Sequence, residues 1–218
     1  MQKVKTDKTK ALYDFDGAFG DGLICGADEA GRGPLAGPVV CAACILPRGA
    51  GYISGINDSK QVSEAERARL YTQITAAAVA YRVAVIDNTT VDRLNILGAT
   101  KAGLTEAILG LSVRPDVILV DAVKNLALGR EYHAIIKGDE KSYAIAAASI
   151  LAKVTRDEIM RKAAQQYPEY GFQHHKGYAT RAHIEAFKSF GKTPLHRETF
   201  IRKLLARMAE EGGDEQSV

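Results

Sequence analysis

The spacing of apolar residues along the chain predicts its secondary structure. Short apolar runs between turn residues predict strands at 23–28, 37–46, 81–87, 116–120 and 132–137. Apolar positions three and four apart predict helices from residue 63, over 91–111, from 142 to about 166, and near 180–189 and 197–211. Because strands come first and then alternate with helices, we expect an α/β domain with a mixed central β-sheet, flanked by helices and followed by a C-terminal helical lobe.

The composition of the segments suggests four divisions of the chain. Residues 1–20 are polar and bear several lysines, which predicts a flexible N-terminal lead-in. A core domain is expected over 21–165, the helical lobe over 166–211 and an acidic tail over 212–218. No apolar run reaches the roughly 18 residues that span a membrane, and the first ten residues lack the apolar stretch of a signal peptide. We therefore expect a cytoplasmic protein that does not contact membranes.

The charge is close to balanced overall but uneven along the chain. The formal net charge is +3, yet residues 171–208 hold eight Lys or Arg against two Glu, together with four of the five histidines. The last ten residues hold four acids and no base. A basic stretch of this kind fits a polyanionic partner, and it fits a solvated helical surface equally well.

The three cysteines do not indicate a metal site or a disulfide framework. Cys41 and Cys44 form a C-x-x-C pattern, but it lies within a predicted strand, where residues three apart point to opposite faces. A zinc site would also need further ligands nearby. We expect buried free thiols.

Acidic residues follow three of the predicted strands. Asp28 and Glu29 end the first strand, Asp121 ends the fourth and Asp139 follows the fifth. An isolated Asp at such a position is usually a turn former or a helix cap. Together, carboxylates on neighbouring strands would repel unless a cation held them, and Mg²⁺ and Mn²⁺ prefer such oxygen ligands. Adjacent strand residues point to opposite faces, so Asp28 and Glu29 converge only if the strand bends or ends between them.

The segment GRGPLAG, which begins at Gly31, could bring the backbone close to a ligand. It departs from the dinucleotide-binding pattern, because its third glycine comes one position late and the nearby prolines oppose a helix. Backbone groups of Gly31 and Gly33 could instead contact a sugar or phosphate, with Arg32 as a phosphate clamp. The alternative is a plain hairpin loop.

Five segments together resemble the bacterial ribonuclease HII family. They are GADEAGRGPLAGPV from residue 26, DSK at 58–60, ILVDA at 118–122, KGDEKSYAIAAASILAKVTRD at 137–157 and HHKGYATRAH at 174–183. The resemblance implies an RNase H-like fold and hydrolysis of the RNA strand of RNA–DNA hybrids. It also implies cleavage 5′ of single ribonucleotides embedded in duplex DNA, with Mg²⁺ or Mn²⁺ as the cofactor. The expected cleavage by a metal-activated water would leave 3′-hydroxyl and 5′-phosphate ends.

The resemblance also assigns roles to residues. The implied catalytic and metal-binding set is Asp28, Glu29, Asp121 and Asp139. The implied substrate contacts are Gly31, Arg32 and Gly33, which would read the ribose 2′-hydroxyl, together with Lys60 and Tyr178. Tyr178 would pack on the sugar that follows the ribonucleotide. The segment VDAVKNLALG departs from the family pattern after Asp121, where many members have Asp-Gly.

One face of the long predicted helix is polar. At about 100° per residue, one stripe is formed by Ser142, Ser149, Lys153 and Arg156. This stripe could follow a phosphate backbone, and we include Ser149 and Lys153 among the expected substrate contacts; a solvated helix face explains it as well. His174 and His175 are expected to contact phosphate or to lie on the surface.

Two other functions remain open from the sequence. The chain could be a DNA nuclease or a transposase-like enzyme, which would cut all-DNA duplexes. It could also be a hybrid-binding module without activity, which chelator-sensitive cleavage would dismiss. We expect a monomer. DNA-replication or repair proteins are candidate partners, but the sequence does not specify which.

Overall fold

A mixed five-stranded sheet forms the centre of the molecule. The computed structural model describes residues 8–49 and 51–213, with side chains up to residue 210. The strands are β1 (Ile24–Ala30), β2 (Val39–Ile45), β3 (Ala80–Ile86), β4 (Val117–Asp121) and β5 (His133–Ile135), in the order β3-β2-β1-β4-β5. β1, β2 and β3 pair antiparallel, whereas β1, β4 and β5 pair parallel. The predicted mixed sheet is confirmed.

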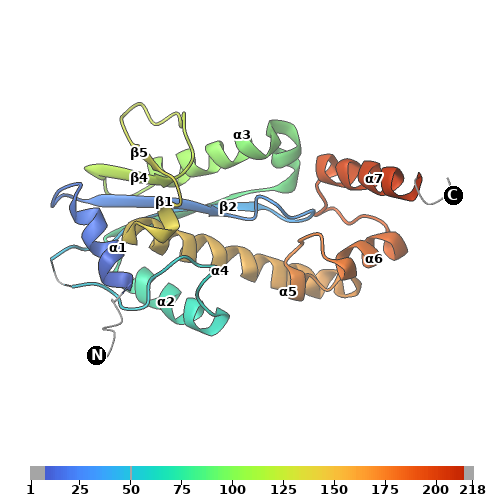
Figure 1. Ribbon diagram of the computed structural model, residues 1–218, viewed down its shortest axis with the longest axis horizontal. Helices are drawn as coiled ribbons and strands as arrows, with labels where there is room; N and C mark the ends of the chain where they lie inside the picture. The colour runs from blue at the N-terminus through green and yellow to red at the C-terminus, as the bar shows by residue number, and fades with distance from the viewer. Residues whose placement is uncertain (1–7, 50, 214–218) are drawn as a thin grey trace.

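Helices cover both faces of this sheet (Figure 1). α3 (Asn88–Leu109) packs on one face, and α4 (Tyr143–Gln166) with α2 (Glu64–Ala77) packs on the other. β2 therefore reads as a continuous apolar run, because both of its faces are buried. Cys41 belongs to the core under α3 and Cys44 to the core under α4, and all three cysteines are free. The expectation of buried thiols on opposite faces is confirmed.

The helix α4 approaches β1 unusually closely at Gly26. A Cβ atom at Gly26 would lie 2.0 Å from the carbonyl carbon of Ala144, so glycine is required there. The residues that follow, Ile145 to Ala148, are all fully buried. This approach places the start of α4 against the first half of β1, and the residue after β1, Gly31, lies against Arg156 further along α4.

The expected flexible lead-in over 1–20 is wrong for Lys8–Gly17, which form helix α1. Leu12 is buried in the core under α4, and Asp16 Oδ2 accepts a hydrogen bond of 2.8 Å from the backbone N–H of Ala144. The helix has only a weak apolar stripe, so the pattern did not predict it; tertiary contacts hold it in place. The expected acidic tail at 212–218 lies outside the described residues except 212 and 213, which end α7.

The predicted helices are present with one change. The segment expected to be one helix over 91–111 is interrupted at Asn95, whose side chain accepts from the N–H groups of Leu97 and Gly98 and restarts the helix. The C-terminal lobe consists of η2 (Pro168–Tyr170), α5 (Phe172–His175), α6 (Arg181–Phe190) and α7 (Glu198–Gly213), at the far end of the sheet from α1 (Figure 1). In the described part of the chain, no helix combines the length and apolar character needed to cross a membrane.

Candidate active site

Three acidic residues converge at the edge where the parallel strands end. Asp28 lies in β1, Asp121 is the last residue of β4, and Asp139 lies in the short helix η1 (Gly138–Glu140). β1 and β4 are parallel neighbours, so their carboxyl ends meet. One carboxylate oxygen from each residue lies within 4.8 Å of the other two, and Asp28 is only 5% exposed. The structure therefore brings together three of the four predicted acids.

The position of Asp139 is set by the turn that contains it. The backbone N–H of Gly138 donates to Asp121 Oδ1 at 2.7 Å, which ties η1 to the end of β4. The N–H of Ser142 donates to the carbonyl of Gly138 at 2.8 Å, and the Ser142 hydroxyl caps α4 by accepting from Ile145. Asp139 is thus held between β4 and the start of α4.

Glu29 lies apart from this group because β1 continues straight through Asp28 and Glu29. Glu29 is paired with Cys41, which faces the core under α3, so the two adjacent acids point to opposite faces of the sheet. Arg32 Nη1 donates to Glu29 Oε1 at 3.3 Å, and Glu29 Oε2 is buried without a hydrogen-bond partner among the described residues. A role for Glu29 as a metal ligand stays a prediction.

The environment of the acids disfavours their charged forms. Burial, together with the negative charges of Glu29 and Asp121, raises the pKa of Asp28 well above its usual value. Burial is also the main cause of the raised pKa of Asp121 and of Glu29. Burial lowers the pKa of Lys60, but the hydrogen bond of 3.1 Å from Lys60 Nζ to Asp139 and the negative charges of Asp139, Asp58 and Asp28 together outweigh burial, so the pKa is raised.

This donor set fits a hard divalent cation. All the converging groups are carboxylate oxygens, the ligands that Mg²⁺ and Mn²⁺ prefer. Within the described residues, Arg32 and Lys60 are the cations that form ion pairs with the four acids, so negative charge remains in excess. Glu29, on the other face of the strand, lines the same cavity and has one buried carboxylate oxygen without a partner among the described residues. A bound cation would favour the charged carboxylates, because it would offset both their burial and their mutual repulsion.

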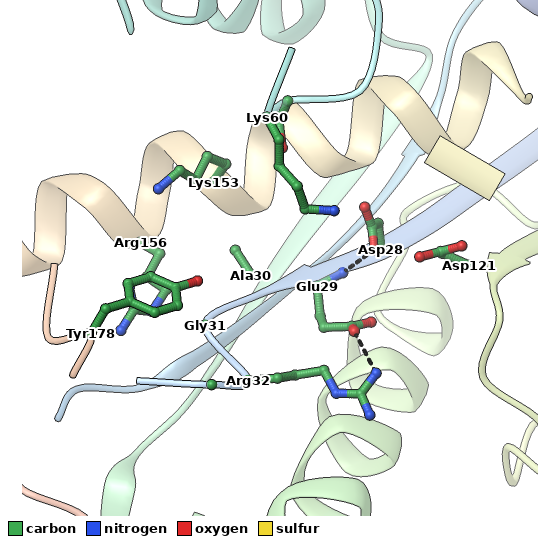
Figure 2. Close-up of a pocket in the computed structure, with 12 residues that line it drawn as sticks. Asp28, Glu29, Ala30, Gly31, Arg32, Lys60, Asp121, Lys153, Arg156 and Tyr178 are labelled. Atoms are coloured by element: carbon green, nitrogen blue, oxygen red, sulfur yellow. Dashed lines mark hydrogen bonds and ion pairs between the residues drawn. The ribbon is translucent and has the colours of Figure 1, made fainter. Parts of the chain in front are cut away.

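A cavity of about 480 Å³ extends from the acids to Tyr178 (Figure 2). Nine of the predicted site residues line it: Asp28, Glu29, Gly31, Arg32, Gly33, Lys60, Asp121, Lys153 and Tyr178. Tyr178 is 44% exposed. Its ring lies 3.7 Å from the position that a Cβ atom of Gly33 would take. The cavity thus joins the acidic group to a glycine loop and an exposed aromatic ring.

The glycine loop is fixed from behind by Arg156. Gly31 has a φ of +94°, and a Cβ atom there would lie 2.0 Å from Arg156 Nε. The buried guanidinium of Arg156 donates to the carbonyl oxygens of Ala36, Pro38 and Lys176. Arg156 therefore connects the glycine loop to the segment that carries Tyr178.

A second buried arginine, Arg197, completes this support. It is fully buried and donates to the carbonyl oxygens of Gly31, Arg32 and Gly37 at 2.7 to 2.9 Å. Burial, with the charge of Arg156 nearby, lowers the pKa of Arg197 to about 9. In the sequence Arg197 is visible only as part of a basic stretch, because its acceptors lie about 160 residues away.

The expected exposed polar stripe on α4 is wrong. Ser149 is 2% exposed, and its hydroxyl donates to the carbonyl of Ala146 and accepts from the N–H of Ser59. Arg156 is buried, and Lys153 Nζ donates to Asp157 at 2.7 Å. These residues do share one face, but the loops at 36–38, 59 and 176 cover it. Ser149 does not line the cavity.

The fold and the site define a class of protein, a nucleic-acid hydrolase on an RNase H-like α/β framework. The family model for Ribonuclease HII matches residues 25–204. A Ribonuclease HII of Ruminiclostridium cellulolyticum is 50% identical over 205 residues, which are 94% of this chain and 78% of that protein. The chain belongs to the ribonuclease HII family.

Solved structures agree with this assignment. The ribonuclease H2 of Pyrococcus horikoshii aligns with a TM-score of 0.69 and 28% identity, covering 84% of this chain and 97% of that one. The PCNA–RNase HII complex of Archaeoglobus fulgidus aligns with a TM-score of 0.68 and 26% identity, covering 81% and 94%. The chain is a nuclease with ribonuclease H activity on RNA–DNA hybrids, and its family depends on divalent metal ions.

Proposed function

We propose that the protein also cleaves duplex DNA on the 5′ side of a single embedded ribonucleotide, leaving 3′-hydroxyl and 5′-phosphate ends. The observation that supports this is the single cavity, which has the acidic group at one end and the Gly31–Gly33 loop with Tyr178 at the other (Figure 2). A phosphate at the acidic end would place its neighbouring sugars toward the loop and the ring.

The acidic end is proposed to hold Mg²⁺ or Mn²⁺. Asp28, Asp121 and Asp139 would bind the ion, and Glu29, which lines the same cavity, would be a further ligand. When bound, such an ion supplies the charge that activates water and stabilises the phosphate. Lys60 retains its proton because of Asp139, and its side chain is 78% exposed, so its ammonium is available to a phosphate oxygen.

The other end is proposed to read the sugars. The 2′-hydroxyl both donates and accepts, and only ribose has it. Within the described residues, the N–H groups of Arg32 and Gly33 have no protein acceptor, whereas the carbonyls of Gly31 and Arg32 are bound by Arg197. Free N–H groups suit the 2′-hydroxyl oxygen, and Arg32 suits a phosphate. Tyr178 would pack on the following deoxyribose, where a 2′-hydroxyl would crowd the ring.

The roles that we propose for Ser149 and Lys153 differ from the direct substrate contacts expected from the sequence. We propose that Ser149 acts indirectly, because its hydroxyl holds Ser59 beside Lys60 and does not reach the cavity. Lys153 lines the cavity but is paired with Asp157, so its contribution to phosphate binding is proposed to be small.

Three end-labelled duplexes test the proposal: all DNA, DNA with one ribonucleotide, and a continuous RNA–DNA hybrid. With Mg²⁺ or Mn²⁺, we expect cleavage of the second and third only, with 5′-phosphate and 3′-hydroxyl ends and no activity in EDTA. A 2′,3′-cyclic phosphate product would contradict attack by water. Cleavage of the all-DNA duplex would indicate a DNA nuclease, and an intact single-ribonucleotide duplex would limit the activity to continuous hybrids.

Replacing the ring tests the proposed reading of the junction. Tyr178→Ala should lower kcat/KM on the single-ribonucleotide duplex by roughly tenfold to a hundredfold, the usual loss for a stacked aromatic contact. The loss on a continuous hybrid should be smaller, because the next sugar there is a ribose. Equal losses on both substrates would contradict a junction-reading role for Tyr178.

The assembly and location of the protein remain part of this proposal. We propose a cytoplasmic monomer, which light scattering of the purified protein would check. The Archaeoglobus fulgidus relative was solved in a complex with PCNA, and we extend a contact with a DNA-replication protein to this chain. Co-elution with a purified sliding clamp would support that contact.

A further inference from the structure

The C-terminal lobe contains three histidines that pack together beneath Tyr178. His183 is fully buried and His196 is 4% exposed. His175 stacks on His183, with ring centroids 4.5 Å apart, and aromatic rings of η2 and α5 surround the pair. His175 is half-buried at the end of α5, whereas His174 is exposed, as the surface position expected for both would require.

The hydrogen bonds assign one tautomer to each of the two buried rings. His183 Nδ1 lies 2.9 Å from the carbonyl oxygen of Tyr178, so it carries a proton and donates it there. The backbone N–H of Thr193 donates to His196 Nδ1 at 2.8 Å, so that nitrogen is unprotonated. His196 Nε2 then carries the proton and donates to His183 Nε2 at 3.1 Å. Donation runs in one direction, from Thr193 through both rings to Tyr178.

This histidine chain, from Thr193 through His196 and His183 to Tyr178, requires both rings to be neutral. A second proton on His183 would point two N–H groups at each other across 3.1 Å. Burial favours the neutral state, since it lowers the pKa of His183 to about 4 and also lowers the pKa of His196. At neutral pH the chain is therefore complete.

One end of the histidine chain holds a backbone segment that needs external support. Lys176 and Gly177, which precede Tyr178, both have positive φ values, of 51° and 84°. The N–H of Tyr178 donates to the carbonyl of His175, and its carbonyl accepts from His183. The Tyr178 ring itself is substantially exposed, so these backbone bonds fix where it stands.

The other end of the histidine chain lies against the glycine loop. His196 forms an isolated β-bridge with Ala36, and the next residue, Arg197, binds the carbonyl oxygens of Gly31 and Arg32. The histidine chain thus links the support of the glycine loop to the support of Tyr178.

We propose that His183 and His196 are positioning residues that set the Tyr178 ring against the Gly31–Gly33 loop, and thereby set the preference for an isolated ribonucleotide over a continuous hybrid. This inference rests on the junction-reading role proposed above for Tyr178. Neither histidine lines the cavity, so both act through the backbone of the ring and not on the substrate.

Two amide replacements of His183 separate positioning from packing. Asn places its amide nitrogen where His Nδ1 stands and can still donate to Tyr178, whereas the amide of Gln reaches the position of Nε2. We expect His183→Gln to lower the kcat/KM ratio of single-ribonucleotide duplex to hybrid by about tenfold. His183→Asn should keep the ratio within about twofold. The matched control is His174→Ala, which replaces an exposed histidine two residues before the Lys176–Gly177 turn. This variant should not change the ratio.

Coupling to the ring gives the second part of the experiment. If His183 acts through Tyr178, His183→Gln should not change the ratio further in a Tyr178→Ala background. Equal losses on both substrates in His183→Gln, or a further change in the double variant, would overturn the proposal. Thermal unfolding of each variant identifies any that do not fold. If His183→Gln does not fold, the apolar His183→Leu, which also lacks the donor to the Tyr178 carbonyl, replaces it, with the same expected loss of ratio.

A structural readout separates failure of this inference from failure of the proposed function. Nitrogen NMR should find the Nδ1–H tautomer at His183 and the Nε2–H tautomer at His196. Amide exchange at Gly177 and Tyr178 should be faster in His183→Gln than in His183→Asn. If Tyr178→Ala leaves the substrate ratio unchanged but these signals are as expected, the junction-reading role is wrong and the positioning is retained. Other tautomers, or equal exchange rates, would overturn the positioning itself.

Discussion

The two ends of the cavity are stabilised in opposite ways. At the acidic end, Asp28 and Asp121 have raised pKa values and a carboxylate oxygen of Glu29 is buried without a partner among the described residues. At the other end, which we propose reads the sugars, Arg197 and His183 donate to backbone carbonyl oxygens. The acidic end is therefore incomplete without a cation, whereas the reading end is ordered before any ligand binds.

This difference predicts opposite responses to mutation. Removing a charge at the acidic end removes repulsion together with activity. Removing a group at the reading end leaves a buried partner unsatisfied, which typically costs about 1–3 kcal/mol. Stability and activity should therefore change independently at the acidic end and together at the reading end.

The largest effect is expected for Asp121→Asn. The amide still accepts from the N–H of Gly138 but loses the charge, so kcat/KM should fall by at least about a hundredfold. The melting temperature in EDTA should stay equal or rise, because one of several crowded charges is gone. A large drop in melting temperature would instead show that Asp121 mainly holds the turn at η1.

A pair of glycine substitutions tests how rigid the reading end is. Gly31→Ala should destabilise the protein by about 3 kcal/mol, because its φ is positive and its Cβ would overlap Arg156. In Gly33→Ala the added Cβ would make only an ordinary contact with the Tyr178 ring, so the free energy of unfolding should change by no more than about 0.5 kcal/mol. Urea unfolding of both variants measures the difference. Equal stabilities would mean that the loop adapts freely.

The buried His183 should make the stability of the protein depend on pH in the acidic range. The pKa of His183 is lowered from 6.5 to about 4, mainly by burial and also by His175 and His196, while Glu198 acts on His196. Its contribution is complete above pH 6.5 and is lost as the pH falls through about 4, on the order of 2 kcal/mol. Unfolding of the native protein should therefore show a steeper loss over this range than unfolding of His183→Asn. Parallel curves would contradict a neutral buried His183.

The smallest effects are expected for the lysines along the cavity. Lys60 is largely exposed, so Lys60→Ala should reduce the slope of log K against log salt for duplex binding by about 1. Lys153 is already neutralised by Asp157, so Lys153→Ala should change the slope by less than half as much. Binding titrations in EDTA at several salt concentrations measure both slopes, and equal slopes would restore Lys153 as a phosphate contact.

The acidic group was predictable because it depends on local positions. Each of its acids follows a strand whose apolar pattern is clear, and parallel strand ends meet. The alternation of side chains along a strand also indicates that Glu29 points to the face opposite to that of Asp28. The family motifs added Tyr178, which the residues alone would not have singled out.

The reading end was less predictable because burial depends on distant segments. The stripe on α4 correctly placed Ser149 and Arg156 on one face, but it could not show that loops from other parts of the chain cover that face. Buried arginine is rare unless it is paired, so Arg197 looked like a surface charge. Helix α1 was missed because contacts with α4, and not its own pattern, hold it in place.

The separation of Arg197 from its acceptors has a consequence for the order of folding. The start of β1 is tied to that of β4 by a bond between Leu23 and Asp116, 93 residues apart, whereas Arg197 reaches the carbonyl of Gly31 across 166 residues. During synthesis the chain emerges from its N-terminus, so Asp139 is present before Arg197. The three converging acids can therefore assemble while the Gly31–Gly33 loop, which we propose selects the substrate, is still without its anchor. A partly synthesised chain that folds before Arg197 emerges would therefore have the residues proposed for cleavage in place before those proposed for substrate selection.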